Sequence, residues 1–136
     1  MIKVFLSVPM RGRKKENVEY TVNRIKAITS QILFDQDEIE FVYTKMLNDD
    51  LGSNITDKER IVYLSDSIKR MADCDYIVVL DGLYYEFRGC NVEHMIANNY
   101  GINVIHLNSE WVIKEDELQE IHRKINNCEC EGTCSR

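Results

Sequence analysis

Four short runs, each nearly all apolar, constrain the fold of this chain more than any other feature. They occupy residues 2–7, 41–44, 76–80 and 104–107. A strand with one face in water alternates apolar and polar residues, whereas a run without alternation is typical of a parallel sheet covered on both faces. The runs therefore predict buried parallel strands.

Segments with helical character separate these runs. We expect helices over residues 16–34, 57–71, 89–99 and 114–125. Thr56 or Asp57 is placed to cap the second helix, and Gly101 is placed to end the third. Strands that alternate with helices predict the α/β class: a single Rossmann-like, flavodoxin-like domain of three layers, with a parallel sheet of four to five strands.

Length and charge limit the function further. The 136 residues suit one domain, which we place at residues 1–127, followed by a polar, cysteine-containing tail at 128–136. Seventeen Lys and Arg against 23 Asp and Glu give a net charge of −6, so we expect neither a nucleic acid polymer nor a membrane surface as partner. No stretch approaches the roughly 20 apolar residues of a membrane span. We expect a cytoplasmic protein that binds a small molecule.

The five cysteines do not form the pattern of a disulfide framework, because their number is odd and two of them lie at element boundaries. Cys128, Cys130 and Cys134 could be joined by His122 as four zinc ligands, but the spacing lacks paired C-x-x-C motifs. A frayed polar tail is the better interpretation. We therefore predict no metal site and no cofactor.

The loops that follow the four strands are the predicted location of a ligand site. In a doubly wound sheet, ligands bind beyond the carboxyl ends of the strands. The corresponding segments are residues 7–13, 45–56, 81–91 and 108–109. The long polar segment 45–56 has the length of loops that often carry function.

Glu93 is the strongest candidate for chemistry in these segments. It follows the third strand and its loop, and we expect it in the first turn of a helix, where backbone N–H groups and the helix dipole favour the ionised form. A carboxylate held ionised beside a cleft can act as a nucleophile. The alternative is that Glu93 only complements the start of the helix.

The first loop contains basic residues that suit an anion. Arg11, Arg13 and the backbone around Gly12 could hold a phosphate or a polar sugar, or could simply be solvated. The loop lacks the glycine pattern of a dinucleotide site or a P-loop, so neither of those sites is supported.

Three segments together resemble the nucleoside 2-deoxyribosyltransferase superfamily. They are Val4–Gly12, Cys74–Gly82 and Arg88–Glu93. The likeness is closest to the small bacterial and phage branch, whose first loop reads like Gly-Pro-Met-x-Gly, and it extends to the deoxynucleoside 5′-monophosphate N-glycosidases. The resemblance implies cleavage of an N-glycosidic bond by double displacement, with Glu93 attacking the anomeric carbon.

The resemblance also implies a second carboxylate and a set of substrate contacts. Asp66 is the best second catalytic carboxylate, although it could equally pair with Lys69 or Arg70 on its own helix. The residues implied to bind substrate are Phe5, Ser7, Met10, Arg11, Gly12, Asp81, Gly89 and Asn91. Arg11 would contact a phosphate, if the substrate has one. Tyr84, Tyr85 and Phe87 could stack on a base or pack onto the sheet.

The chain departs from the family pattern at positions that affect specificity. Phe87 replaces a serine that contacts the 5′ position, Leu83 replaces a tryptophan, and Cys90 replaces an alanine. Relatives assemble as homo-oligomers, and Asn108 or Ser109 is the nearest candidate for a residue that crosses to a neighbour. The first hypothesis is a nucleoside or nucleotide N-glycosidase or deoxyribosyltransferase. The alternative is a non-catalytic module that binds a nucleotide or a nucleotide signal.

Overall fold

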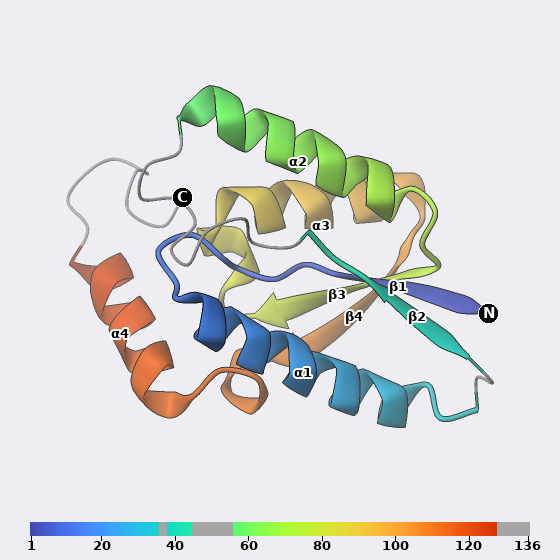
Figure 1. The fold of residues 1–136 in the computed structure, drawn as a ribbon, viewed down its shortest axis with the longest axis horizontal. Helices are drawn as coiled ribbons and strands as arrows, with labels where there is room; N and C mark the ends of the chain where they lie inside the picture. Colours follow the sequence, from blue (N-terminus) through green and yellow to red (C-terminus); the bar gives the residue numbers. More distant parts are fainter. Residues whose placement is uncertain (36–37, 45–55, 128–136) are drawn as a thin grey trace.

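The four predicted strands form one parallel sheet. They are β1 (Ile2–Leu6), β2 (Ile39–Val42), β3 (Tyr76–Asp81) and β4 (Asn103–Asn108), in the order β2-β1-β3-β4 (Figure 1). The structure is a computed structural model that describes residues 1–35, 38–44 and 56–127. The prediction of a parallel sheet is confirmed. The second strand begins two residues earlier than expected, because Ile39 and Glu40 pair with Ile2 and Lys3.

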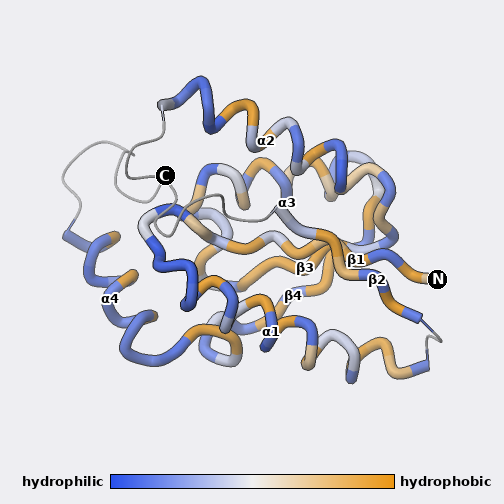
Figure 2. The backbone as a smooth tube through the Cα atoms, in the orientation of Figure 1, coloured by the Kyte–Doolittle hydropathy of each residue, from blue (hydrophilic) through white to orange (hydrophobic). Residues whose placement is uncertain are grey.

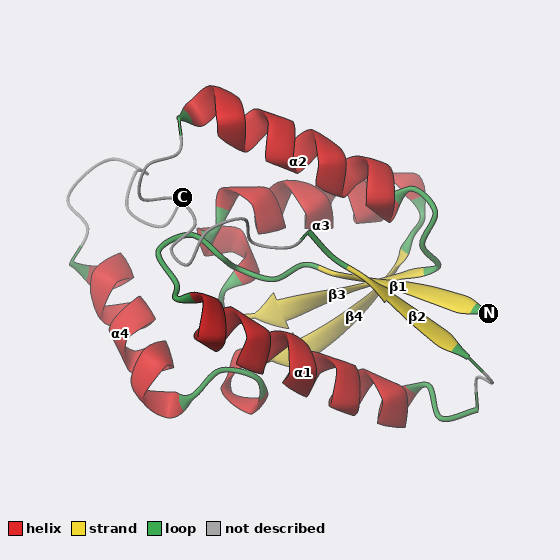
Figure 3. Cartoon of the chain, viewed as in Figure 1, coloured by secondary structure: helices red, strands yellow, loops and turns green. Residues whose placement is uncertain are grey.

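Helices cover both faces of this sheet, as the sequence predicted. The long ones are α1 (Lys15–Ile32), α2 (Asp57–Met71), α3 (Arg88–Tyr100) and α4 (Glu115–Asn126), with short 3₁₀ helices η1 (Tyr84–Glu86) and η2 (Ser109–Trp111). Figure 3 shows α1 and α4 on one side of the strands and α2 and α3 on the other. None of the helices in the described part of the chain is long and apolar enough to cross a bilayer.

Both faces of the central strands are buried, which explains their unbroken apolar sequence. On β1, the side chains of Val4 and Leu6 belong to the core that includes residues of α1 and α4, whereas Phe5 belongs to the core that includes Met71 of α2 and Ala97 of α3. Figure 2 shows largely hydrophobic strands between helices in which hydrophilic and hydrophobic residues are mixed. A sheet buried in this way holds its carboxyl ends in fixed positions for a site.

Local signals in the sequence set the ends of the elements. Thr56 caps α2 in a capping box, in which its hydroxyl accepts from the Glu59 amide at 3.2 Å. Gly101 ends α3 in the left-handed conformation, with φ of 76°. Gly12 has φ of 74° in a turn closed by a hydrogen bond from the Arg13 amide to the Met10 carbonyl at 3.0 Å.

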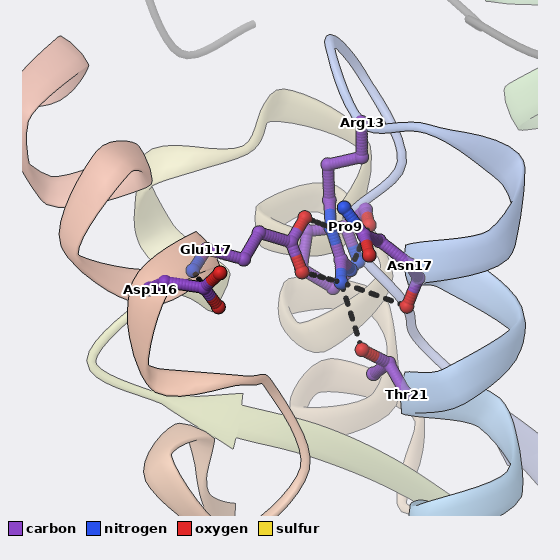
Figure 4. Close-up of polar contacts among 6 residues, drawn as sticks. All are labelled: Pro9, Arg13, Asn17, Thr21, Asp116 and Glu117. Carbon is purple, nitrogen blue, oxygen red and sulfur yellow. Dashed lines mark hydrogen bonds and ion pairs between the residues drawn. The ribbon is translucent and has the colours of Figure 1, made fainter.

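A buried arginine joins the β1–α1 loop to both α1 and α4 (Figure 4). Arg13 is only 3% exposed, and its guanidinium binds the two carboxylate oxygens of Glu117 at 2.7 Å each. It also donates to the Pro9 carbonyl at 2.8 Å, to Thr21 Oγ1 at 2.8 Å and to the Asn17 carbonyl at 3.2 Å. The interpretation of Arg13 as a phosphate ligand or a solvated residue is wrong, because the fold itself uses its donors.

Replacing Glu117 with alanine should lower the free energy of unfolding by about 3–5 kcal/mol, because it leaves the buried Arg13 charge without its carboxylate. Denaturant titration measures this change. Glu120→Ala is the matched control, since it removes an exposed ion pair with Arg123 from the same helix and should affect stability far less. Equal effects of the two substitutions would contradict a structural role for Arg13.

Candidate functional site

The site lies where the winding of the sheet reverses. The chain leaves β1 to form β2 on one side and returns to form β3 on the other side of β1. The connections after β1 and β3 therefore diverge, and a crevice opens beyond the carboxyl ends of these two strands. The β1–α1 loop and the start of α3 border this crevice.

A cavity of about 450 Å³ occupies the crevice, a volume within the range of small-molecule sites. Its walls come from β1 and the loop after it, from α2, and from the first two turns of α3. The lining residues are Phe5, Leu6, Val8, Pro9, Met10, Arg11, Thr44, Asp57, Arg60, Ile61, Tyr63, Leu64, Ser67, Phe87, Arg88, Gly89, Cys90 and Glu93. Most of the wall is apolar, with a few polar and charged groups that could orient a ligand.

Glu93 lies in the wall of this cavity and is only 7% exposed. The Ser7 hydroxyl, directly after β1, donates a hydrogen bond to Glu93 Oε1 at 2.6 Å. The expectation that Glu93 lies in the first helical turn is wrong, because α3 begins at Arg88 and Glu93 is its sixth residue. The free N–H groups and the dipole of a helix act mainly within its first turn.

The protonation state of Glu93 also differs from the expectation. Burial raises the pKa of Glu93 from 4.5 to about 7, although hydrogen bonds from the Ser7 and Ser67 side chains act in the opposite direction. Both the protonated and the ionised form of the carboxyl group are therefore populated near neutral pH. A group poised in this way suits proton transfer as well as nucleophilic attack.

Ser67 connects Glu93 to the carboxyl end of β2. Its side chain is buried on α2, and its hydroxyl lies 2.6 Å from Thr44 Oγ1. Ser7, Glu93, Ser67 and Thr44 thus form one group of polar side chains from four different elements. Each hydroxyl restricts the orientation of its neighbour, which holds the carboxyl group in place.

Asp66, the predicted second carboxylate, does not line the cavity. Its carboxylate forms an ion pair with Arg70 at 2.9 Å, which is the alternative that the sequence left open. Successive helical residues point about 100° apart, so Asp66 and Ser67 face different surroundings. Ser67 stands three residues after Leu64 and four before Met71, and this polar position within an apolar stripe is the signal that sequence reasoning missed.

The other predicted substrate contacts divide into two groups. Phe5, Met10, Arg11 and Gly89 line the cavity, whereas Ser7 does not line it but donates a hydrogen bond to Glu93. The remaining three, Gly12, Asp81 and Asn91, do not line it. Asp81 is exposed and binds His106 Nδ1 on β4 at 2.7 Å, so it is not placed to contact a ligand beside Glu93.

The aromatic residues that could stack on a base, and the residue suggested to reach a neighbouring subunit, lie mostly outside the cavity. Phe87 is buried and forms part of the wall, whereas Tyr84 packs against His94 and Tyr85 is exposed. Asn108 accepts a hydrogen bond from the Glu110 amide at 2.9 Å and thereby caps η2. Asn108 therefore has a structural role within its own chain.

Three arginines are among the residues that line the cavity. Arg11 and Arg60 line it, and Arg88 is exposed at the first residue of α3. Arg60 forms an ion pair with Asp57 at 2.8 Å. Sequence reasoning identified Arg11 but missed Arg60 and Arg88, which lie on helices expected only to cover the sheet.

Cys90 also lines the cavity but is not a candidate nucleophile. Burial, together with the nearby Glu93 charge, raises the pKa of the Cys90 thiol far above its usual range. A thiol in this state is unreactive, because the thiolate is the nucleophilic form. The chemistry of the cavity therefore centres on Glu93.

Two predicted features fall outside the described residues. Residues 45–55 include nearly all of the polar segment after the second strand. Residues 128–136 include the three cysteines of the possible zinc set, whereas His122 is exposed on α4.

No family model, no curated protein and no solved structure matches this chain. Its function is therefore inferred from the geometry of the cavity and from the resemblance of its motifs.

The raised pKa of Glu93 predicts how stability depends on pH. Glu93 binds its proton more tightly in the folded state, so the stability that this group contributes at low pH is lost as pH rises from 4.5 through about 7. Glu93→Gln removes this loss. The free energy of unfolding of the variant minus that of the wild type should therefore be about 3 kcal/mol larger at pH 9 than at pH 4. Denaturant titrations at the two pH values measure the effect.

Glu38→Gln is the control for this measurement, because Glu38 is exposed before β2. It should follow the wild type at both pH values. A Glu93→Gln variant that did the same would show that Glu93 ionises in the folded protein as readily as in the unfolded chain.

Proposed function

We propose that this protein cleaves the N-glycosidic bond of a deoxynucleoside or deoxynucleotide, either by hydrolysis or by transfer of the deoxyribosyl group, with Glu93 as the nucleophile. The observation that carries the proposal is the buried Glu93 carboxyl group, fixed by Ser7 in the wall of a cavity at the switch point of the sheet. Burying an ionisable group costs stability, and such groups are concentrated at functional sites.

The proposed reaction has two steps. An oxygen of ionised Glu93 attacks C1′ of the deoxyribose while the bond from C1′ to the base nitrogen breaks. The electron pair of that bond leaves with the base, which takes a proton from water. Water or the N–H nitrogen of a second base then attacks C1′ and gives its proton to the hydroxide left by the first step. The ester bond to Glu93 breaks at the same time, which restores the carboxylate.

The form of the cavity supports a ligand with one apolar and one anionic part. Phe5, Leu64 and other apolar side chains line it, together with three arginines, Arg11, Arg60 and Arg88, and one aspartate, Asp57, which is paired with Arg60. The Arg88 end of α3 has no side-chain cap, so its backbone N–H groups could also face an anion. These features favour a nucleotide over a nucleoside as the substrate.

We also propose that the protein acts in the cytoplasm. The thiols of Cys74 and Cys90 are free and buried, as is usual for proteins of reducing compartments.

A non-catalytic nucleotide-binding module is the second candidate. The placement of Asp66 outside the cavity favours it, because the carboxylate expected to assist Glu93 is paired with Arg70 instead. Asp57 of α2 does line the cavity, but it is paired with Arg60. A ligand of this module would use the same apolar wall and the same arginines. The two candidates differ only in what happens to the bound ligand.

Incubation of the purified protein with each deoxynucleoside and deoxynucleotide, with and without a second free base, tests the proposal. Chromatography should detect free base if water is the acceptor, and a new nucleoside if a base is. Glu93→Gln should lose at least about a thousandfold in rate, because the amide cannot form the covalent intermediate, while ligand binding is retained. Binding without turnover in the wild type would instead identify a binding module.

The pH dependence of turnover provides a second test. Only ionised Glu93 attacks, so kcat/KM should rise about tenfold from pH 6 to pH 8, around the pKa of about 7. Ser67→Ala removes a hydroxyl that favours ionisation and should shift the rise to higher pH. Ser65→Ala on the exposed side of α2 should leave the profile unchanged. A rate that falls with pH would exclude Glu93 as the nucleophile.

A further inference from the structure

A second cavity adjoins the one that contains Glu93. It has a volume of about 530 Å³ and lies between the β1–α1 loop and α4. Arg11 and Phe87 line both cavities, so these two side chains lie between the two spaces. A ligand that fills the first cavity could therefore extend past Arg11 into the second.

The second cavity has an excess of positive charge in a chain whose net charge is −6. Arg11, Lys14 and Lys124 line it, and Lys14 and Lys124 are exposed. Lys114 also lines it, with its ammonium group 5.0 Å from the centre of the Tyr20 ring. These cations lie on the loop and at both ends of α4.

Two of the three carboxylates that line the second cavity are paired with arginines. Glu117 is bound by Arg13 through two hydrogen bonds, and Glu120 pairs with Arg123 on α4. Asp116 accepts a hydrogen bond from the Glu117 amide at 2.8 Å. Asp116 keeps its negative charge, because an amide donor does not neutralise a carboxylate. The five cationic and three acidic residues of the lining still leave a net charge of +2 for a ligand to meet.

We propose that the ligand is a nucleoside polyphosphate, a di- or triphosphate, whose base and sugar occupy the cavity of Glu93 and whose phosphate chain passes Arg11 toward Lys14 and Lys124. This inference rests on the proposed function for the position of the base and sugar. A monophosphate would reach the arginines of the first cavity and leave the lysines of the second cavity unused. A second free base suits this cavity poorly, because most of its lining side chains are charged.

Calorimetric titration of the full-length Glu93→Gln variant tests the proposal without consuming the ligand. Each deoxynucleoside is compared with its 5′-mono-, di- and triphosphate at low and at physiological salt. For the base that binds best, the triphosphate should bind about tenfold more tightly than the monophosphate, from ion pairs with two or three partly exposed cations. The difference should shrink at higher salt, because such pairs are screened.

Lys14→Ala combined with Lys124→Ala, in the Glu93→Gln background, should make the di- and triphosphate bind no more tightly than the monophosphate, with the affinity for the nucleoside unchanged. Lys58→Ala combined with Lys69→Ala is the control, since it removes the same charge from exposed positions of α2 that line neither cavity. It should preserve the difference between mono- and triphosphate.

Two results would overturn the inference. One is a triphosphate that binds no more tightly than the monophosphate, and the other is a preference for the triphosphate that survives replacement of Lys14 and Lys124. Absence of binding by every nucleotide would also overturn it. The comparison among the nucleotides uses affinities alone, so it does not depend on whether the protein turns them over. If affinity rises from mono- to triphosphate but the wild type cleaves nothing, the proposed reaction is rejected and the polyphosphate site is supported. If the wild type cleaves but affinity does not rise, the polyphosphate site is rejected and the reaction is supported.

Discussion

The placement of β1 between β2 and β3 is the constraint on which the site depends. Both neighbours are parallel to β1, so the chain must leave the sheet on opposite sides after β1 and after β3. That divergence opens the crevice, and Ser7 at the end of β1 then lies against Glu93 of α3. Neither residue could meet the other without the crossing of the chain between β2 and β3, since 86 positions separate them in sequence.

The burial of Glu93 lowers the stability of the fold, because its carboxyl group is removed from water. An apolar residue at this position would extend the core formed by its neighbours, whereas the carboxyl group needs hydrogen-bond donors to remain there. Ser7 and Ser67 supply these donors, and Thr44 in turn lies beside Ser67. Their hydrogen bonds offset only part of the desolvation, so the carboxyl group retains a pKa near 7 and remains responsive to a ligand that excludes water.

The fold could be predicted from the sequence because both faces of the strands are buried. Burial on both faces requires an unbroken apolar run such as Tyr76–Leu80, which is visible in the sequence. It identified Glu93 but not its environment, since burial and the helix start at Arg88 arise only in three dimensions. At Asp66 the structure shows the second of the two alternatives: the resemblance suggested a catalytic carboxylate, whereas the side chain pairs with Arg70 and the polar residue of the apolar stripe of α2 is Ser67. The partner of Arg13 lies 104 residues away, beyond the reach of any local pattern.

The network around Arg13 bears on how a ligand would bind. Pro9, Met10 and Arg11 form one wall of the cavity, and they belong to a loop that would otherwise be ordered only on binding. Arg13 donates a hydrogen bond to the Pro9 carbonyl, and its ion pair with Glu117 connects the same loop to α4. Because these contacts form within the free protein, the wall is ordered before a ligand arrives, and more of the interaction energy is retained as affinity. The same anchor sets the distance between Arg11 and α4, so the cavity beside Glu93 and the cavity along α4 depend on a single buried ion pair.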